Sequence, residues 1–210
     1  MVMPDSDVER VLVVAAHPDD IDFGAAGTIA HWTAAGLTVT YCVCTDGQSG
    51  GFDVDVPREH MPEIRRAEQV AAAATVGVAD VRFLGYVDGE LEASRELVRD
   101  LVRVIRQVQP QRMLVPSPER WWERLPASHP DHLAAGEAAI RALYPFARNP
   151  FAFPELLGTR AWPTGSSTRC GSWPRPARTT LSTSPPPSIA SSRRSSLTRA
   201  STPIASGSDP

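Results

Sequence analysis

Lysine is missing from this 210-residue sequence, and all 21 of its basic residues are arginines. This suggests a GC-rich gene in which arginine codons replace lysine codons. Residues 1–158 hold 14 arginines against 23 aspartates and glutamates, a net charge of −9, whereas 159–210 hold seven arginines and one aspartate. An acidic body of this kind argues against a nucleic-acid-binding surface, so no nucleic-acid partner is expected.

Cysteine is scarce, with only Cys42, Cys44 and Cys170 present. Cys42 and Cys44 lie two residues apart in an apolar run, so they should point to the same face of a strand. Free cysteine commonly packs as a small buried hydrophobe, and the sequence offers no second cysteine pair for a zinc site. We therefore expect both side chains in the core.

Long apolar runs are also absent. No stretch approaches the roughly 20 apolar residues of a membrane span. The first residues, Met1–Asp5, are acidic and are followed by too short an apolar run for a secretory signal. The expectation is a cytoplasmic protein without a membrane span.

What the sequence does contain is a regular alternation of strand and helix patterns. Ser94 is expected to cap one helix, and Gly36 to end another. Repeated β-α alternation predicts an α/β fold, a Rossmann-like open and mostly parallel sheet with helices on both faces. The expected strands are 11–16, 37–45, 81–84 and 113–115, and the expected helices are 24–35, 62–76, 94–109 and 132–143.

This alternation stops near Gly158, which divides the chain into a catalytic α/β domain, 1–158, and a tail, 159–210. Serine, threonine, proline and arginine dominate the tail, and such a composition is typical of disorder. We favour another hypothesis, in which the tail is translated out of frame. A one-nucleotide offset, with suitable codons, turns 183–189 into a strand-like sequence, and the nucleotide sequence of the gene decides the matter.

A His-Pro-Asp-Asp motif at 17–20 directly follows the apolar run 11–16. The run is short, rich in branched residues and does not alternate, which predicts a buried parallel strand. The motif therefore lies at the carboxyl end of a strand, where open α/β sheets bind ligands. His17 and Asp20 are three residues apart in a turn that Pro18 stiffens, so both can face one point.

A second cluster, His129-Pro130-Asp131-His132, lies more than a hundred residues later at the start of a helix pattern. His132 can complete a His-Asp-His set with His17 and Asp20, as in catalytic zinc sites that leave one position for water. The mixture of imidazole and carboxylate suits Zn²⁺, and Fe²⁺ stays open. In the alternative arrangement, both histidines of the second cluster bind the metal and Asp20 does not.

Three further residues are candidates for the chemistry itself. Asp19 lies beside the ligand set but should point elsewhere, so we interpret it as the general base; an N-cap is its alternative role. His129 is placed to stabilise an oxyanion or to protonate the leaving amine. Asp131 is expected to fix the tautomer of His129 and to raise its pKa.

Residues 16–20 and 129–132, in this order, resemble the LmbE-like (PIG-L) zinc-dependent de-N-acetylases over about Val11–Leu157. The resemblance implies that His17, Asp20 and His132 are zinc ligands and that Asp19 is the general base. It also implies that His129 is the second catalytic histidine and Asp131 its partner.

Looser matches to the same family concern the substrate. Arg65 with Glu68 matches an Arg-x-x-Glu pair whose arginine contacts the sugar, although a surface ion pair is the plain alternative. Asp88 lies where a loop aspartate can bind sugar hydroxyls. Ile21 replaces a frequent glutamate, and Trp121-Trp122 could stack on a sugar or simply pack.

The resemblance implies a hydrolase that removes an N-acetyl group from an N-acetylglucosamine-type conjugate, a small molecule. Three alternatives stay open: an amidase for a larger acyl group, a non-catalytic α/β binding module, and an inactive product of a frameshifted gene. Association into a homo-oligomer also stays open.

Overall fold

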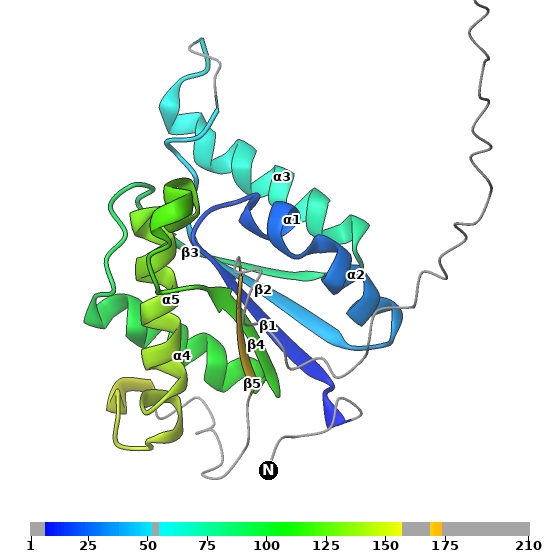
Figure 1. Ribbon diagram of the computed structural model, residues 1–210, viewed down its shortest axis with the longest axis vertical. Helices are drawn as coiled ribbons and strands as arrows, with labels where there is room; N and C mark the ends of the chain where they lie inside the picture. The colour runs from blue at the N-terminus through cyan, green and yellow to red at the C-terminus, as the bar shows by residue number, and fades with distance from the viewer. Residues whose placement is uncertain (1–6, 52–54, 157–168, 174–210) are drawn as a thin grey trace, which may run out of the picture. The chain divides into compact units, whose positions relative to one another are not determined.

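A five-stranded parallel sheet forms the centre of the protein, in the order β3-β2-β1-β4-β5 (Figure 1). The coordinates are a computed structural model, and they describe residues 7–51, 55–156 and 169–173. The strands are β1 (Arg10–Ala15), β2 (Thr38–Thr45), β3 (Asp80–Tyr86), β4 (Arg112–Pro116) and β5 (Arg169–Trp173).

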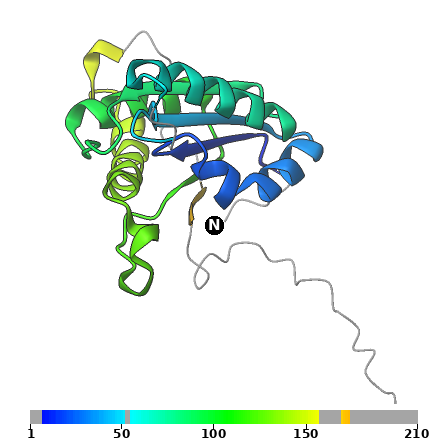
Figure 2. The ribbon, with the colours of Figure 1, turned by 90° about the horizontal axis from the view of Figure 1, so that it is seen from above.

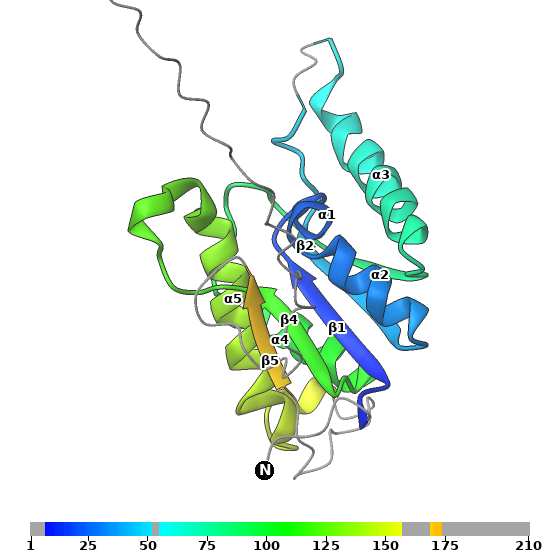
Figure 3. The same cartoon turned by 45° about the vertical axis from the view of Figure 1, so that its right-hand side comes forward.

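Helices cover the sheet on two sides, which confirms the expected α/β layering (Figures 1 and 3). On one side lie α1 (Asp20–Gly24), α2 (Ala26–Ala34) and α3 (Met61–Thr75), and on the other lie α4 (Arg95–Val108) and α5 (Pro130–Leu143). Short 3-10 helices complete the chain: η2 (Arg58–His60), η3 (Trp122–Ser128), η4 (Phe146–Arg148) and η5 (Pro154–Leu156).

Alternate residues of β1 enter the two hydrophobic cores. Leu12 and Val14 pack with α4 and α5, whereas Val11 and Val13 pack with the helices of the opposite layer. Because both faces of the strand are covered, its residues 11–15 are all apolar, as the run 11–16 predicted. Cys42 and Cys44 are buried in the same core cluster, which confirms the expectation for these cysteines.

Ser94 caps α4 as predicted, since its side chain accepts the backbone N–H of Leu97 at 3.2 Å. The predicted helix 24–35 is α2, which begins two residues later than predicted, at Ala26. The short helix α1 before it was not predicted, and Ala25, with φ −144°, separates the two helices. Ile21 of α1 and Ile29 of α2 are both buried in the core on this side of the sheet. Gly36 follows α2 with φ +88°, the left-handed conformation expected of a helix-ending glycine.

The segment between β4 and α5, which the sequence leaves as a loop, contains η3 in its second half. Figure 2 shows this segment extending beyond α5. Ser128 ties its two ends together, since its hydroxyl accepts the backbone N–H of Trp121 at 2.7 Å.

Strand β5 falls within 159–210 and pairs in parallel with β4, with Arg112 opposite Arg169. The rest of that tail lies outside the described residues. The hypothesis that residues 159–210 are translated out of frame stays a prediction. Within the described residues, no helix has both the length and the apolar character to cross a membrane.

Candidate active site

The strand order reverses at β1, which pairs with β2 on one side and β4 on the other. Connections from β1 and β4 therefore diverge at this point, and open α/β sheets bind ligands in the crevice so formed. The 17–20 motif follows β1, and the 129–132 motif lies at the start of α5, after β4. The two motifs are thus brought together by strand order alone.

His17, Asp20 and His132 meet as predicted. One potential ligand atom from each lies within 4.8 Å of those of the other two. His132 Nε2 is 3.0 Å from Asp20 Oδ1, and the rings of His17 and His132 are 5.2 Å apart between centroids. Their mutual arrangement suits a shared cation, and His17, Asp20 and His132 are together called the cation set.

The turn after β1 aims Asp20 at the other two residues. Asp20 is the first residue of α1, and its Oδ2 accepts the backbone N–H groups of Ala16 and His17 at 3.1 and 2.9 Å. These bonds leave Oδ1 directed at His132. Burial raises the pKa of Asp20, but hydrogen bonds with His132 and His17 outweigh it and leave the pKa well below the ordinary value.

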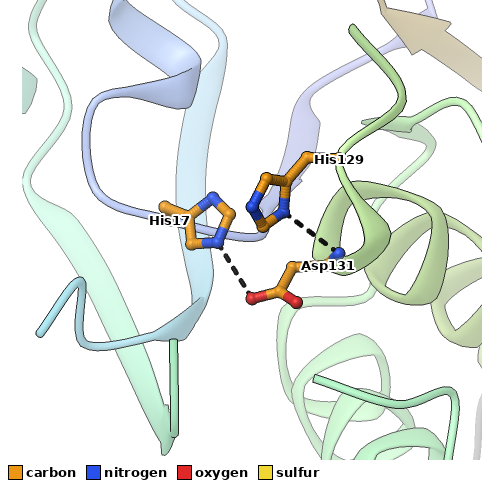
Figure 4. A group of neighbouring side chains, drawn as sticks. All are labelled: His17, His129 and Asp131. Carbon is orange, nitrogen blue, oxygen red and sulfur yellow. Dashed lines mark hydrogen bonds and ion pairs between the residues drawn. The ribbon is translucent and has the colours of Figure 1, made fainter. Parts of the chain in front are cut away.

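His17 is surrounded by three carboxylates. Its Nε2 is 3.0 Å from Asp131 (Figure 4). The same Nε2 is 3.1 Å from Asp88, and Nδ1 is 3.7 Å from Asp20. Burial lowers its pKa, but the carboxylates outweigh burial and raise the pKa to about 9. Surroundings that favour a proton this strongly also favour a metal cation in its place.

His129 is the N-cap of α5, and its Nδ1 accepts the backbone N–H of Asp131 at 3.2 Å (Figure 4). Nδ1 is therefore an acceptor, and a neutral ring carries its proton on Nε2. The pKa of His129 is lowered by burial and by the charge of His17, which outweigh the opposite effect of Asp131. Asp131 therefore acts in the predicted direction, but the net shift of the pKa is downward.

The Asp131 carboxylate lies within 4.8 Å of a ring nitrogen of His129, but its hydrogen bonds go to other groups, contrary to expectation. This buried carboxylate contacts His17 and accepts the backbone N–H groups of Gly89 at 2.8 Å and Leu91 at 3.4 Å. Asp131 fixes the tautomer of His129 through its backbone, because the N–H lies at the helix start. Its carboxylate instead ties α5 to the 88–91 loop.

The Asp19 carboxylate is directed at Arg65 and makes no side-chain cap hydrogen bond at the start of α1. Its Oδ2 is 2.6 Å from Arg65 Nη2, while Arg65 Nη1 is 2.6 Å from Glu68. Arg65 therefore takes part in the surface ion pair and also reaches the candidate site. Burial raises the pKa of Asp19 against the lowering effect of Arg65.

Asp88 is engaged on both carboxylate oxygens. Oδ1 faces His17, and Oδ2 accepts the backbone N–H of Ser49 at 3.1 Å. The Ser49 hydroxyl donates to the backbone carbonyl of Asp88, and the Gln48 side chain accepts the backbone N–H of Asp88. The 47–51 loop is therefore bound to the 86–89 loop. A sugar contact by Asp88 stays a prediction.

Two groups at the site escaped sequence analysis. Gln69 accepts the backbone N–H of Asp19 at 2.7 Å, and Arg66 forms a double ion pair with Asp46 at the base of the 47–51 loop. Gln69 lies four residues after Arg65 in α3, and this helical spacing was the available signal. No comparable spacing links Arg66 to Asp46, which lie in different elements.

The parallel sheet and the His/Asp cluster at its carboxyl edge define an α/β protein with a candidate metal centre. The chain belongs to the GlcNAc-PI de-N-acetylase (PIG-L) family, whose profile matches residues 12–143.

Named relatives of this chain are deacetylases. It is 36% identical over 140 residues to the diacetylchitobiose deacetylase of Thermococcus kodakarensis, covering 67% of this chain and 51% of that protein. It is 40% identical over 139 residues to a probable N-acetyl-alpha-D-glucosaminyl L-malate deacetylase 2 of Bacillus cereus, covering 64% of this chain and 60% of the relative.

A solved structure agrees in fold. The N,N'-diacetylchitobiose deacetylase from Pyrococcus horikoshii, in complex with its inhibitor MPG, superposes with a TM-score of 0.71 and 34% identity. The match covers 78% of this chain and 60% of that chain. The chain thus spans between half and two thirds of the length of these relatives.

Proposed function

We propose that this protein hydrolyses the N-acetyl group of a small amino-sugar conjugate of the N-acetylglucosamine type, releasing acetate and a free amine. The observation that carries the proposal is the convergence of His17, Asp20 and His132, with Asp19 and His129 beside them. The names of the relatives, which are deacetylases of amino sugars, support the same substrate class.

The donor set fits a divalent metal, and His17, Asp20 and His132 would hold it. Two imidazoles and one carboxylate suit zinc, with Fe²⁺ as the other candidate. When bound, the metal polarises the amide carbonyl and lowers the pKa of water. The depressed pKa of Asp20 keeps that side chain anionic, the form in which a carboxylate binds a cation.

Asp19 would act as the general base. Its side chain is 47% exposed, so one carboxylate is open to solvent next to the buried cation set. Because the neighbouring Arg65 holds Oδ2, Asp19 is oriented before substrate arrives. The attacking water would transfer its proton to this carboxylate as the C–O bond forms.

His129 would stabilise the oxyanion that forms at the amide carbon. Its Nδ1 is occupied by the N–H of Asp131, so the Nε2–H group is the one available to donate. The amide C–N bond then breaks, and the departing nitrogen takes a proton from Asp19 or His129. Acetate and the amino sugar leave.

Arg65 would bind the sugar. Its Nε is buried and, among the described residues, has no hydrogen-bond partner. Leaving a buried donor unpaired costs free energy. A hydrogen bond to a substrate hydroxyl would offset that cost. Asp88 could join it if substrate displaced the contact with Ser49.

Acetate release from N-acetylglucosamine conjugates, measured with zinc-loaded protein, tests the proposal. Asp19→Ala should abolish turnover and keep zinc, whereas His17→Ala should lower the zinc-to-protein ratio. His31→Ala, an exposed histidine of α2, is the matched control and should change neither. Unchanged zinc in His17→Ala would contradict the ligand set, and release only of longer acyl groups would identify an amidase instead.

A further inference from the structure

Helix α3 holds the turn that carries Asp19 through two side chains on one face. Arg65 and Gln69 are four residues apart, so they lie one above the other on the helix surface. Arg65 Nη2 donates to the Asp19 carboxylate at 2.6 Å and to the Pro18 carbonyl at 3.2 Å. Gln69 Oε1 accepts the backbone N–H of Asp19 at 2.7 Å. Both the side chain and the backbone of Asp19 are therefore held from α3.

Both ends of the Gln69 amide are used, although the residue is only 1% exposed. Oε1 faces the N–H of Asp19, and Nε2 donates to the Asp22 carboxylate at 3.4 Å. A backbone N–H can only donate and an ionised carboxylate can only accept, so these partners fix the orientation of the amide. By accepting from Nε2, Asp22 orients the Gln69 amide so that Oε1 faces the backbone N–H of Asp19.

The backbone of Asp19 needs such support. Its φ of +85° lies in a region that residues other than glycine rarely adopt. A strained residue of this kind costs about 1–3 kcal/mol and persists only where the surrounding structure determines its conformation. The Asp19 carbonyl begins α1, accepting from Asp22, and its N–H is held by Gln69.

We propose that Gln69 is a positioning residue for the hydrolysis: it holds Asp19 in the strained turn and so aims the carboxylate at the reacting water. Gln69 does not itself touch the substrate. This inference rests on the proposed function, in which Asp19 is the general base. Without Gln69 the turn relaxes, and a misplacement of about 1 Å at a catalytic group can lower a rate about 100-fold.

Gln69→Met in the full zinc-loaded chain tests the inference, because methionine keeps the length of the side chain but cannot hold the N–H. We expect kcat to fall about 10- to 100-fold with KM changed less than about threefold and zinc content unchanged. Gln111→Met is the matched control. Gln111 Oε1 also accepts a backbone N–H, that of Arg10 at 2.8 Å, at the opposite end of β1. Its kcat should equal that of the parent.

Two outcomes of these assays would overturn the positioning role. One is a parent-like kcat in Gln69→Met, and the other is a loss of kcat that follows a loss of zinc. The double variant Q69E/D22N exchanges donor and acceptor while keeping both contacts. It should recover most of the lost kcat, and a double variant as slow as Gln69→Met with zinc intact would count against the role.

Hydrogen exchange of the Asp19 amide gives a readout that does not depend on activity. The amide should be protected in the parent and in Gln111→Met, and should exchange at least about tenfold faster in Gln69→Met. If the parent releases no acetate, the proposed function fails, and the exchange still tests the hold on the turn. An unprotected Asp19 amide in the parent would overturn the inference.

If Gln69→Met does not fold, Asp22→Ala replaces it, since this change removes only the contact that orients the amide. A smaller rise in exchange and a smaller fall in kcat are then expected, and parent values for both would overturn the inference.

Discussion

At His129, the ring nitrogen that faces the start of α5 is already used, because Nδ1 accepts the backbone N–H of Asp131. Because the capping bond uses Nδ1 as an acceptor, the proton of the neutral His129 ring is on Nε2. No carboxylate is needed to fix this tautomer. Asp131 then becomes available to His17 and to the 88–91 loop. One residue thus orients two histidines, one through its backbone and one through its side chain.

Gly136 sets how closely α5 approaches the end of β4. A Cβ at this position would lie 2.3 Å from the carbonyl oxygen of Pro116, a backbone atom that cannot simply rotate away. Gly136→Ala should therefore displace α5 and with it the second motif, destabilising the protein by about 1–3 kcal/mol or more. Thermal unfolding measures this loss, and acetate release should fall as well.

Gly27→Ala is the matched control for Gly136→Ala, because a Cβ on this helical glycine of α2 meets nothing within 4 Å. Replacing an exposed helical glycine by alanine stabilises by up to about 1 kcal/mol, so its Tm should rise. Equal melting of the two variants would show that the approach of α5 to Pro116 is looser than described.

Among the elements, α4 holds the segment that follows α5. Arg106 is buried, and its guanidinium donates to the backbone carbonyls of Phe146, Ala147, Asn149 and Ala152. Burial lowers its pKa, yet an arginine stays charged at neutral pH. Backbone N–H groups of Asn149 and Ala152 also reach the carbonyls of Phe146 and Asn149, so the guanidinium adds a donor to these two and serves those of Ala147 and Ala152 as well.

Arg106→Met should remove the guanidinium donor from all four carbonyls, while those of Phe146 and Asn149 keep their backbone partners. We expect a loss of about 3 kcal/mol, which lowers Tm by roughly 6–12 °C. Arg141→Met is the control, since Arg141 donates to one carbonyl, that of Ala93, at an exposed site. Its Tm should stay within about 2 °C of the parent. Similar melting of both variants would contradict a structural role for the buried arginine.

Asp100 links α4 to the end of β3. It accepts the Tyr86 hydroxyl at 2.9 Å and pairs with Arg103 at 2.7 Å. Burial raises the pKa of Asp100, but these hydrogen bonds and Arg99 outweigh it and lower the pKa below the ordinary value. A lowered pKa in the folded state means that the carboxylate stabilises above the unfolded pKa and loses this effect as pH falls through the folded pKa.

Asp100→Asn should accordingly lower Tm near pH 7 by a few degrees, for a loss of about 1 kcal/mol. The difference from the parent should shrink as pH falls below about 4. Melting curves between pH 7 and 3 check this, with the exposed Glu137→Gln as control. A difference that grows toward low pH would reverse the assigned sign.

For the whole molecule, the proposed metal would link binding to folding. The cation set draws on the turn after β1 and on α5, so a bound ion joins segments that are 115 residues apart between His17 and His132. A metal at 100 times its Kd adds about 2.7 kcal/mol, or roughly 5–10 °C in Tm. Chelation should remove this increment and added zinc should restore it.

His17→Ala should show no such increment, whereas His31→Ala should show the full one. Equal melting of the chelated and zinc-supplemented parent would contradict a metal centre at these residues.

The sequence by itself determined the α/β architecture and the residues of the cation set. Residues 11–15 of β1 are apolar on both faces, and α4 has one apolar face, so each element can be buried in only one way. The two motifs follow strands whose carboxyl ends must share an edge of the sheet. Helix α1 and the break at Ala25 were not predicted, because alanine favours helix and nothing in the local pattern marks an interruption there.

Tertiary structure alone decided the partners within the site. Asp131 faces His17 and not His129, and Gln69 holds Asp19 across 50 residues, because these contacts depend on the angle at which α3 and α5 meet the turn after β1. Local periodicity specifies which face of an element is buried. It carries no information on which polar atoms from distant elements come within 3 Å of one another, since that depends on how all the elements pack together.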